Sequence, residues 1–223
     1  MSRSGGADRV TSLWSAPNLL SFSRIVAAPI LYVLIVAGGR YGYLAAAVVF
    51  VLASFTDTLD GEIARRGKQV SPFGIYLDTT ADKILIAVLL VALAAVHLAP
   101  GWMAAVIIAR EFLVTGLRSY AAALGVIIPA GGWGKAKTII TIVALFLVLF
   151  EGDARQGGLL SSHTPPGSVL VSPVGPFTVA VWGLLIAVIW TVGSGLEYIR
   201  EAIPLLTGAR PLADPVSGSG DEV

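Results

Sequence analysis

The sequence has no cysteine and only two histidines, His97 and His163, among its 223 residues. Without cysteine there is no disulfide scaffold, no thiol nucleophile and no thiolate metal site. Charged residues are also scarce, at 13% of the chain, and a formal net charge of +1 gives no support for nucleic-acid binding. His97 ends an apolar run just before Pro100, a position that favours a cap at a membrane interface over a metal ligand.

Hydrophobic residues, in contrast, make up 56% of the chain, and the mean hydropathy is +0.83. This composition excludes an ordinary soluble domain, and the length suits about six membrane helices of ~20 residues each. We therefore expect an all-α integral membrane protein with six transmembrane helices. The apolar runs that predict them are Leu19–Ala37, Tyr41–Phe55, Gly74–His97, Trp102–Leu124, Trp133–Phe150 and Val174–Ile199.

The chain predicts one membrane domain, at 17–203, with short polar ends. Residues 1–16 lack the pattern of a signal peptide and are expected to lie at the cytoplasmic interface. Residues 204–223 are rich in Pro, Gly, Ser and Asp and are expected to be a disordered cytoplasmic tail. Residues 152–173, rich in Gly, Ser and Pro, predict an external loop without chemistry.

In this predicted topology, the basic residues near the helix ends lie mostly on one side of the membrane. Only Arg40 and Arg155 lie on the other side. Because cytoplasmic loops carry the excess of Lys and Arg, both termini and the loop between the second and third helices should be cytoplasmic. An even number of helices agrees with that orientation. The basic residues on the predicted cytoplasmic side are Arg3, Arg9, Arg65, Arg66, Lys68, Lys135, Lys137, Arg200 and Arg210.

One acidic stretch, DTLDGEIARRGKQVSPFGIYLDTTAD at 57–82, organises the chain. In its first half, Asp57 and Asp60 share a helical face with Gly61, Ala64 and Arg65, and in its second half Asp78 and Asp82 share a face with Gly74. Gly67 and Pro72 predict a turn between the two halves. The two faces should therefore meet as parts of two antiparallel helices.

Four carboxylates that converge at a membrane boundary repel one another strongly and are usually functional. Two hard divalent cations, Mg²⁺ or Mn²⁺, would balance Asp57, Asp60, Asp78 and Asp82. The alternative is that the aspartates are solvated helix ends or structural ion pairs with Arg65, Arg66, Lys68 or Lys83. We expect a metal site at the cytoplasmic side of the second and third helices.

The pattern D-x2-D-G-x2-A-R-x8-G-x3-D-x3-D resembles the signature of the CDP-alcohol phosphotransferases, which are integral membrane enzymes of phospholipid synthesis. Its fixed positions are matched by Asp57, Asp60, Gly61, Ala64, Arg65, Gly74, Asp78 and Asp82. Thr79 departs from the proline that many members have there. The resemblance implies displacement of CMP from a CDP-linked donor, two metal ions and a homodimer. No residue here is an obvious covalent nucleophile, which favours direct displacement over a two-step route.

The same resemblance implies a role for each position. Asp57 and Asp78 bridge both ions, Asp60 completes the shell of one, and Asp82 joins the other and is the general base. The CDP-diacylglycerol contacts are Gly61, Ala64, Arg65 and Ser71: the two small residues let the nucleotide lie against the backbone, and the other two reach the donor's headgroup.

A cationic cluster follows on the fourth and fifth predicted helices, in IAREFLVTGLRSY and GWGKAKT. Arg110 and Arg118 lie two turns apart on one face, whereas Lys135 and Lys137 point to nearly opposite sides. The alternative interpretation is structural: Arg110 and Glu111 would merely neutralise each other, and the two lysines would merely mark the cytoplasmic boundary. Taken together, the four cations favour a phosphorylated second substrate.

These segments, with an opening P-N-x-L-x-x-x-R at Pro17, Asn18, Leu20 and Arg24, resemble the phosphatidylglycerophosphate synthases of that family. The resemblance implies glycerol 3-phosphate as acceptor and CDP-diacylglycerol as donor. Arg24 itself would either snorkel to the lipid headgroups or contact an anionic lipid or diphosphate. Two other functions stay open: a family member that uses another acceptor, such as inositol phosphate, and a divalent-cation transporter.

Overall fold

The computed structural model describes residues 16–67, 72–126, 132–159 and 163–206. Within these ranges, the side chains of 55–67, of 132–135 and of a few residues at helix ends lie outside the description. The predicted cytoplasmic ends of the chain fall largely outside it as well. However, the last helix continues to Leu206, so residues 204–206, which we assigned to the tail, are helical.

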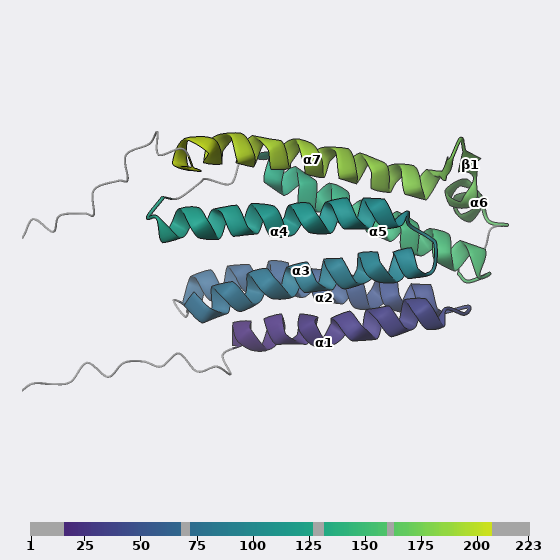
Figure 1. The fold of residues 1–223 in the computed structure, drawn as a ribbon. Helices are drawn as coiled ribbons and strands as arrows, with labels where there is room; N and C mark the ends of the chain where they lie inside the picture. Colours follow the sequence, from purple (N-terminus) through teal and green to yellow (C-terminus); the bar gives the residue numbers. More distant parts are fainter. Residues whose placement is uncertain (1–15, 68–71, 127–131, 160–162, 207–223) are drawn as a thin grey trace, which may run out of the picture.

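The described residues form seven helices and one two-stranded hairpin (Figure 1). Each of the six apolar runs overlaps one long helix, which confirms the prediction of a mainly helical chain. The bounds of these helices are α1 Ala16–Ala37, α2 Gly42–Gly67, α3 Pro72–Ala95, α4 Gly101–Ala123, α5 Gly132–Arg155 and α7 Val179–Leu206. The end of α2 at Gly67 and the start of α3 at Pro72 bracket the predicted turn, whose residues 68–71 are outside the described ranges.

The long helices run side by side in two groups of three. In one group α1 packs against α2 and α3, and in the other α7 packs against α4 and α5. Contacts of α2 with α5 and of α3 with α4 join the groups. Figure 1 shows that the start of α1 and the end of α7 lie at the same end of the bundle, and that α6 and the hairpin lie at the other. We call these the α1-start end and the α6 end.

α1 shows how the sequence directs its packing. The buried residues of this helix recur every three or four positions, which is the period of one helical face: Asn18, Ser21, Arg24, Ala28, Leu31 and Ile35. The apolar members join a core cluster that extends through α2, α3, α4, α5 and α7. The polar members lie nearer the start of the helix. Arg24 is therefore carried on the inward face and does not snorkel to the surface.

The segment 152–173 differs from its prediction as an irregular loop. α5 continues through Glu151 and Asp153 to Arg155, and a short helix, α6, covers Pro165–Val171. The strands β1 Pro173–Val174 and β2 Phe177–Thr178 then form an antiparallel hairpin. Periodicity could not predict these elements, because they are too short to repeat a pattern and the segment is rich in Gly and Pro. Two prolines at the first turn of α6 are where helices tolerate them.

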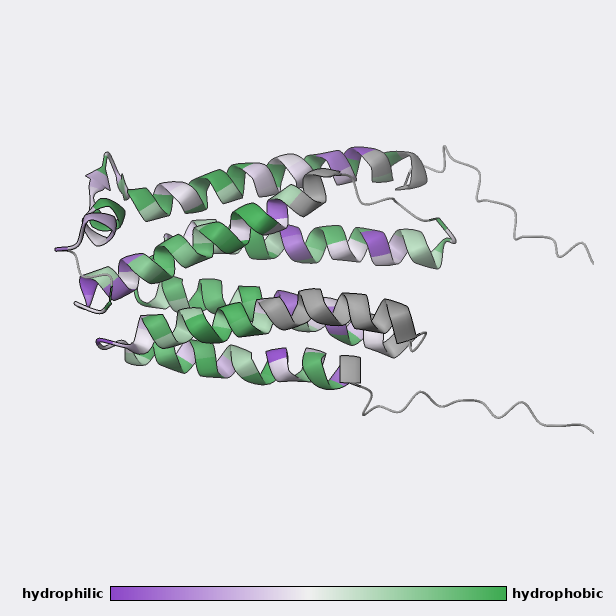
Figure 2. Ribbon diagram, turned by 180° about the vertical axis from the view of Figure 1, so that it is seen from behind, coloured by the Kyte–Doolittle hydropathy of each residue, from purple (hydrophilic) through white to green (hydrophobic). Residues whose placement is uncertain are grey.

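The outward faces of the long helices are apolar along much of their length. Large hydrophobic side chains that are exposed include Val33, Leu52, Ile139 and Ile189, and Figure 2 shows that apolar positions dominate the middle of the bundle. By length and composition alone, Asn18–Ala37 and Val179–Arg200 are apolar enough to cross a membrane. The apolar part of α2, Gly42–Ser54, is shorter. Exposed apolar surface on this scale indicates contact with lipid or with another protein.

Candidate active site

The first half of the acidic motif lies on the C-terminal part of α2. Asp57, Asp60, Gly61, Ala64 and Arg65 are helical, as their spacing predicted, and their side chains are outside the described set. Ser71 lies between α2 and α3, outside the described residues. Lys135 belongs to α5, and its side chain is likewise not described.

The second half of the motif lies on the first turns of α3, next to α1. Arg24 Nη1 is 2.9 Å from Asp78 Oδ1 and 3.9 Å from Asp82 Oδ1. Ser21 Oγ also donates to Asp78 Oδ1, at 3.2 Å. The Arg24 side chain is only 1% exposed, whereas those of Asp78 and Asp82 are 50% and 44% exposed. The carboxylates are therefore open to a ligand on one side and held by a buried guanidinium on the other.

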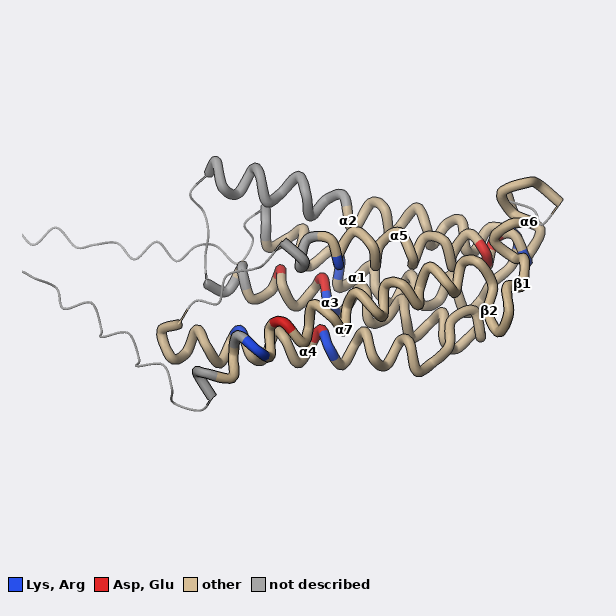
Figure 3. The backbone as a smooth tube through the Cα atoms, turned by 90° about the horizontal axis from the view of Figure 1, so that it is seen from above, with Lys and Arg blue, Asp and Glu red and all other residues tan. Residues whose placement is uncertain are grey.

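Asp82 also lines a pocket of about 600 Å³ between α3, α4, α5 and α7. Three of the four predicted acceptor-binding cations, Arg110, Arg118 and Lys137, line the same pocket. The apolar part of its wall comes from Ile86, Ile107, Val114 and Ile139. Figure 3 shows the charged positions of α3 and α4 close together, well away from a second charged group near α6 and β1. We call this pocket the cationic pocket.

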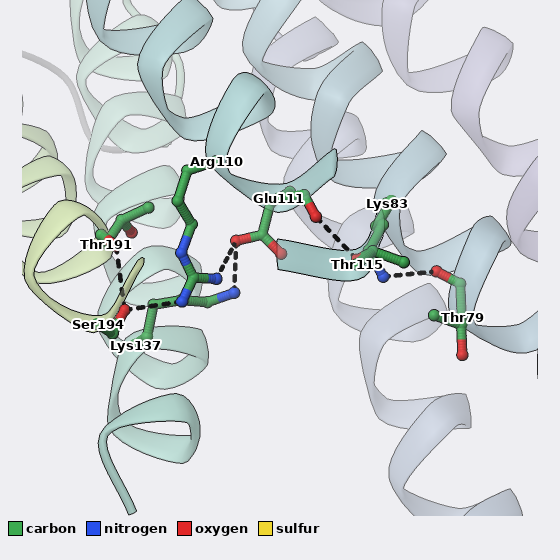
Figure 4. A network of polar contacts seen from close by, with 8 residues as sticks. All are labelled: Thr79, Lys83, Arg110, Glu111, Thr115, Lys137, Thr191 and Ser194. Atoms are coloured by element: carbon green, nitrogen blue, oxygen red, sulfur yellow. Dashed lines mark hydrogen bonds and ion pairs between the residues drawn. The ribbon is translucent and has the colours of Figure 1, made fainter. Parts of the chain in front are cut away.

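Glu111 is the hub of the polar contacts in the cationic pocket (Figure 4). Its Oε1 accepts a hydrogen bond from Arg110 Nη1 at 3.1 Å and another from Lys137 Nζ. Arg110 Nη2 donates to Ser194 Oγ of α7, at 2.9 Å. Arg110 and Glu111 thus pair as the sequence analysis allowed. The pairing is not mutual neutralisation alone, because one carboxylate is shared by two cations.

The electrostatic balance of the cationic pocket favours a multiply charged anion. The side chains of Arg110, Lys137 and Glu111 are only 10%, 13% and 18% exposed, so water screens them little. Lys83 and Arg118 add positive charge, and Lys83 Nζ donates to the backbone oxygen of Thr79 at 3.1 Å. A phosphate monoester would meet several donors in an environment of low dielectric. Guanidinium and ammonium groups are the usual partners of phosphate.

Sequence reasoning missed the contribution of α7 to the cationic pocket. Tyr198 lines the pocket, and Ser194 lies one turn before it. Polar residues spaced three and four apart in an apolar helix, Thr191, Ser194 and Tyr198, were a signal that could have located this face. Thr141, one turn after Lys137 on α5, was missed as well. Thr141 lines the pocket, and its buried hydroxyl has no hydrogen-bond partner within the described part of the chain.

The described side chains contain no group of three or more acidic, histidine or cysteine residues that could hold a metal ion. Asp57 and Asp60 are not among these side chains. Asp78 and Asp82 fit a hard cation in their chemistry, because both are half-exposed carboxylates one turn apart on α3. Both contacts made by Asp78 use Oδ1, so Oδ2 is the oxygen that it would offer to a cation.

Known proteins resemble this chain over most of its length. The profile of the CDP-alcohol phosphatidyltransferase family matches residues 14–193. A CDP-diacylglycerol–glycerol-3-phosphate 3-phosphatidyltransferase from Bacillus subtilis (strain 168) is 35% identical over 201 residues, covering 85% of this chain and 95% of the relative. Proteins of the same name from Pseudomonas fluorescens and Cereibacter sphaeroides are 37% and 32% identical, covering 85% and 86% of this chain and 91% and 97% of the relatives.

The family profile covers the acidic motif and every residue that lines the cationic pocket except Tyr198, which lies beyond its end at residue 193. The enzymatic interpretation is therefore confirmed at the level of the family, and the alternative of a cation transporter loses its basis. This chain belongs to the CDP-alcohol phosphatidyltransferase family.

Proposed function

We propose that this enzyme transfers the phosphatidyl group from CDP-diacylglycerol to the primary hydroxyl of sn-glycerol 3-phosphate. The products are phosphatidylglycerol phosphate and CMP. The relatives in Bacillus, Pseudomonas and Cereibacter carry the name of this reaction. The observation that carries the proposal is the meeting of Asp82 with Arg110, Arg118 and Lys137 in one pocket. A carboxylate beside several cations suits a substrate with one hydroxyl to deprotonate and one phosphate to hold.

Each side of the cationic pocket takes one part of the acceptor. Arg110, Arg118 and Lys137 bind its phosphate, and Lys135, whose side chain is not described, is a fourth candidate. Asp82 faces the hydroxyl end. In the transfer step the acceptor oxygen forms a bond to the phosphatidyl phosphorus, and the bond from that phosphorus to the CMP oxygen breaks. The hydroxyl proton passes to Asp82, which acts as general base.

The donor lies along α2 in this proposal. Gly61 and Ala64 leave room for the nucleotide against the helix backbone, and Arg65 and Ser71 contact its headgroup. Asp57, Asp60, Asp78 and Asp82 would hold two Mg²⁺ ions, with Mn²⁺ as an alternative. When bound, such ions neutralise diphosphate charge and stabilise the leaving group. The half exposure of Asp78 and Asp82 supports this assignment, since both carboxylates are accessible to a ligand from solvent.

The lipid donor implies a membrane setting. We propose that all six long helices cross the bilayer, with both termini and the site on the cytoplasmic side, and that the enzyme is a homodimer. The apolar outward faces support the crossing, and the placement of both described ends at the α1-start end agrees with an even number of crossings. Several charged residues of these helices line the pocket: Asp82 and Lys83 of α3, Arg110, Glu111 and Arg118 of α4, and Lys137 of α5. Membrane helices tolerate charges that face such a cavity.

The test is the release of CMP from CDP-diacylglycerol by purified protein, with one acceptor offered at a time. Glycerol 3-phosphate should support release that depends on Mg²⁺, whereas serine should not. Inositol phosphate is the discriminating arm, because it also carries a phosphate for the cationic pocket. Release that is faster with inositol phosphate than with glycerol 3-phosphate would assign the other acceptor. The mass of the detergent-solubilised protein measures the proposed dimer.

A further inference from the structure

Arg110 is held by α7 as well as by its neighbours in the cationic pocket. Its Nη2 donates to Ser194 Oγ at 2.9 Å, and Ser194 Oγ donates in turn to the backbone oxygen of Thr191 at 3.1 Å (Figure 4). A serine hydroxyl has only one proton to donate. Because the carbonyl of Thr191 takes that proton, the lone pairs of Ser194 Oγ are left to accept from the guanidinium. Ser194 is 1% exposed, so water does not compete for this contact.

Gly195 shapes the other side of the same contact. A Cβ atom at this position would lie 3.1 Å from Cγ of Arg110 and 3.3 Å from its Nε. Carbon atoms in favourable contact lie about 3.5–4.0 Å apart, so a methyl group there would displace the arginine stem. Glycine costs helix stability at an interior position. Its presence opposite Arg110 therefore has a steric reason, because any larger residue would require the arginine stem to move away from α7 by a few tenths of an ångström.

Gly193 supplies the comparison on the same helix. It is exposed, and a Cβ atom there would have nothing within 4 Å. Both glycines are in the interior of α7, and only Gly195 faces Arg110.

The guanidinium is thus held at its two terminal nitrogens, by Glu111 Oε1 on Nη1 and by Ser194 on Nη2. Its Nε is buried and has no hydrogen-bond partner within the described part of the chain. That nitrogen lies toward Gly195 rather than toward an acceptor atom. A phosphate would consequently meet the remaining N–H groups of Nη1 and Nη2, whose direction is decided by the two contacts that hold them.

We propose that Ser194 and Gly195 are positioning residues for the acceptor phosphate, and that they act by holding Arg110 against α7. This inference rests on the proposed function, because it needs Arg110 to bind the acceptor. It adds a part of the chain, the last helix, that the acidic and cationic motifs do not include. A guanidinium held in place before the substrate arrives loses less conformational freedom on binding.

The experiment measures steady-state CMP release with three single variants, Ser194→Ala, Gly195→Ala and Gly193→Ala. Each variant is assayed with glycerol 3-phosphate varied at saturating CDP-diacylglycerol. It is then assayed with CDP-diacylglycerol varied at saturating glycerol 3-phosphate. Direct loss of a charge-assisted hydrogen bond changes affinity by roughly ten- to a hundredfold. The effect here is indirect, so we expect the KM for glycerol 3-phosphate to rise about three- to tenfold in the first two variants. The KM for the donor should stay within about twofold, and Gly193→Ala should match the unmodified protein.

A double-mutant cycle separates positioning from general structural damage. In an Arg110→Lys background the guanidinium is gone, so Ser194→Ala should raise the KM for glycerol 3-phosphate no further. An equal rise in both backgrounds, a joint rise of both KM values, or no rise at all would overturn the inference. Should Ser194→Ala fail to fold, Gly195→Ala tests the same contact without removal of a hydrogen bond. If the unmodified protein releases no CMP with glycerol 3-phosphate, the proposed function itself fails, which is a distinct result.

Discussion

The guanidinium of Arg24 and the carboxylate of Asp78 form an ion pair that joins α1 to α3, with 2.9 Å between Nη1 and Oδ1. Its two ends differ in environment, because Arg24 is 1% exposed and Asp78 is 50% exposed. Asp82 Oδ1 is farther from the same nitrogen, at 3.9 Å. Of these two carboxylates, Asp78 is the nearer partner of the buried arginine, and it is also a residue to which we assign a metal.

Asp78→Asn should reduce stability as well as activity. Removal of one partner of a fully buried ion pair costs about 3–5 kcal/mol. The cost here should be smaller, about 1–3 kcal/mol, because Asp78 is half-exposed and Asp82 remains near Arg24. Thermal unfolding in detergent without Mg²⁺ measures it, with Asp82→Asn as the matched control. Equal melting temperatures for the two variants would show that Arg24 does not depend on Asp78.

Asp82→Asn should reduce chemistry more than donor binding. Asparagine keeps the shape and one oxygen, but it cannot accept the proton of the acceptor hydroxyl. General-base catalysis contributes ~10²–10⁴-fold, and we expect kcat to fall by about that factor. Donor affinity in the presence of Mg²⁺ is measured by calorimetry, and kcat is measured across pH. Complete loss of donor binding would make Asp82 chiefly a metal ligand, and an unchanged kcat would assign the base elsewhere.

Lys137→Met should weaken acceptor binding more than Arg118→Gln. Lys137 is 13% exposed and shares Glu111 Oε1 with Arg110, so its loss removes a cation and leaves Glu111 less neutralised beside the phosphate. Arg118 is exposed, where solvent weakens its contribution. We expect the KM for glycerol 3-phosphate to rise roughly ten- to a hundredfold for Lys137→Met. Saturation curves for both substrates measure this, and a selective rise in the donor KM would reassign the lysine.

Thr178→Val should destabilise the α6 end and leave catalysis unchanged. Thr178 Oγ1 donates to Glu151 Oε2 at 2.8 Å and accepts from the backbone N–H of Val181 at 3.3 Å. Glu151 is buried and also accepts from Arg155. Loss of the hydroxyl should lower the free energy of unfolding by about 1–3 kcal/mol. Chemical unfolding measures this, with Ser168→Ala, at an exposed site of the same end, as control. A matching loss of kcat would show that the two ends are coupled.

Single-cysteine labelling tests the proposed crossing of the membrane. The natural chain has no cysteine, so Gln156→Cys and Ala123→Cys each carry one thiol without background. The two positions are exposed, Gln156 just after α5 and Ala123 at the end of α4. A membrane-impermeant maleimide should label Gln156→Cys in intact cells and Ala123→Cys only after permeabilisation. Labelling of both thiols in intact cells, or the reverse preference, contradicts the topology.

Periodicity found the long helices because each carries a stripe or a run of apolar residues long enough to repeat. It did not find α6 or the hairpin, since elements of a few residues contain less than two periods of any pattern. Spacing also could not decide whether Lys135 or Lys137 faces the site. It gives the angle between the two side chains around the helix axis, but not which of them points toward a neighbouring helix. The contacts of Lys137 with α4 set it for that residue.

The sequence by itself determined the helical class, the acidic motif and the residue types of the cationic cluster, because helix periodicity and charge are local properties of a chain. The tertiary structure decided which of those charges meet. Arg24 was expected at lipid headgroups or at a ligand. Because α1 packs on α3, its guanidinium instead forms an ion pair with Asp78. Ser194 and Gly195 reached Arg110 only because α7 packs on α4, across more than eighty residues of chain. Contacts between distant segments depend on how whole helices pack, and no local pattern encodes that.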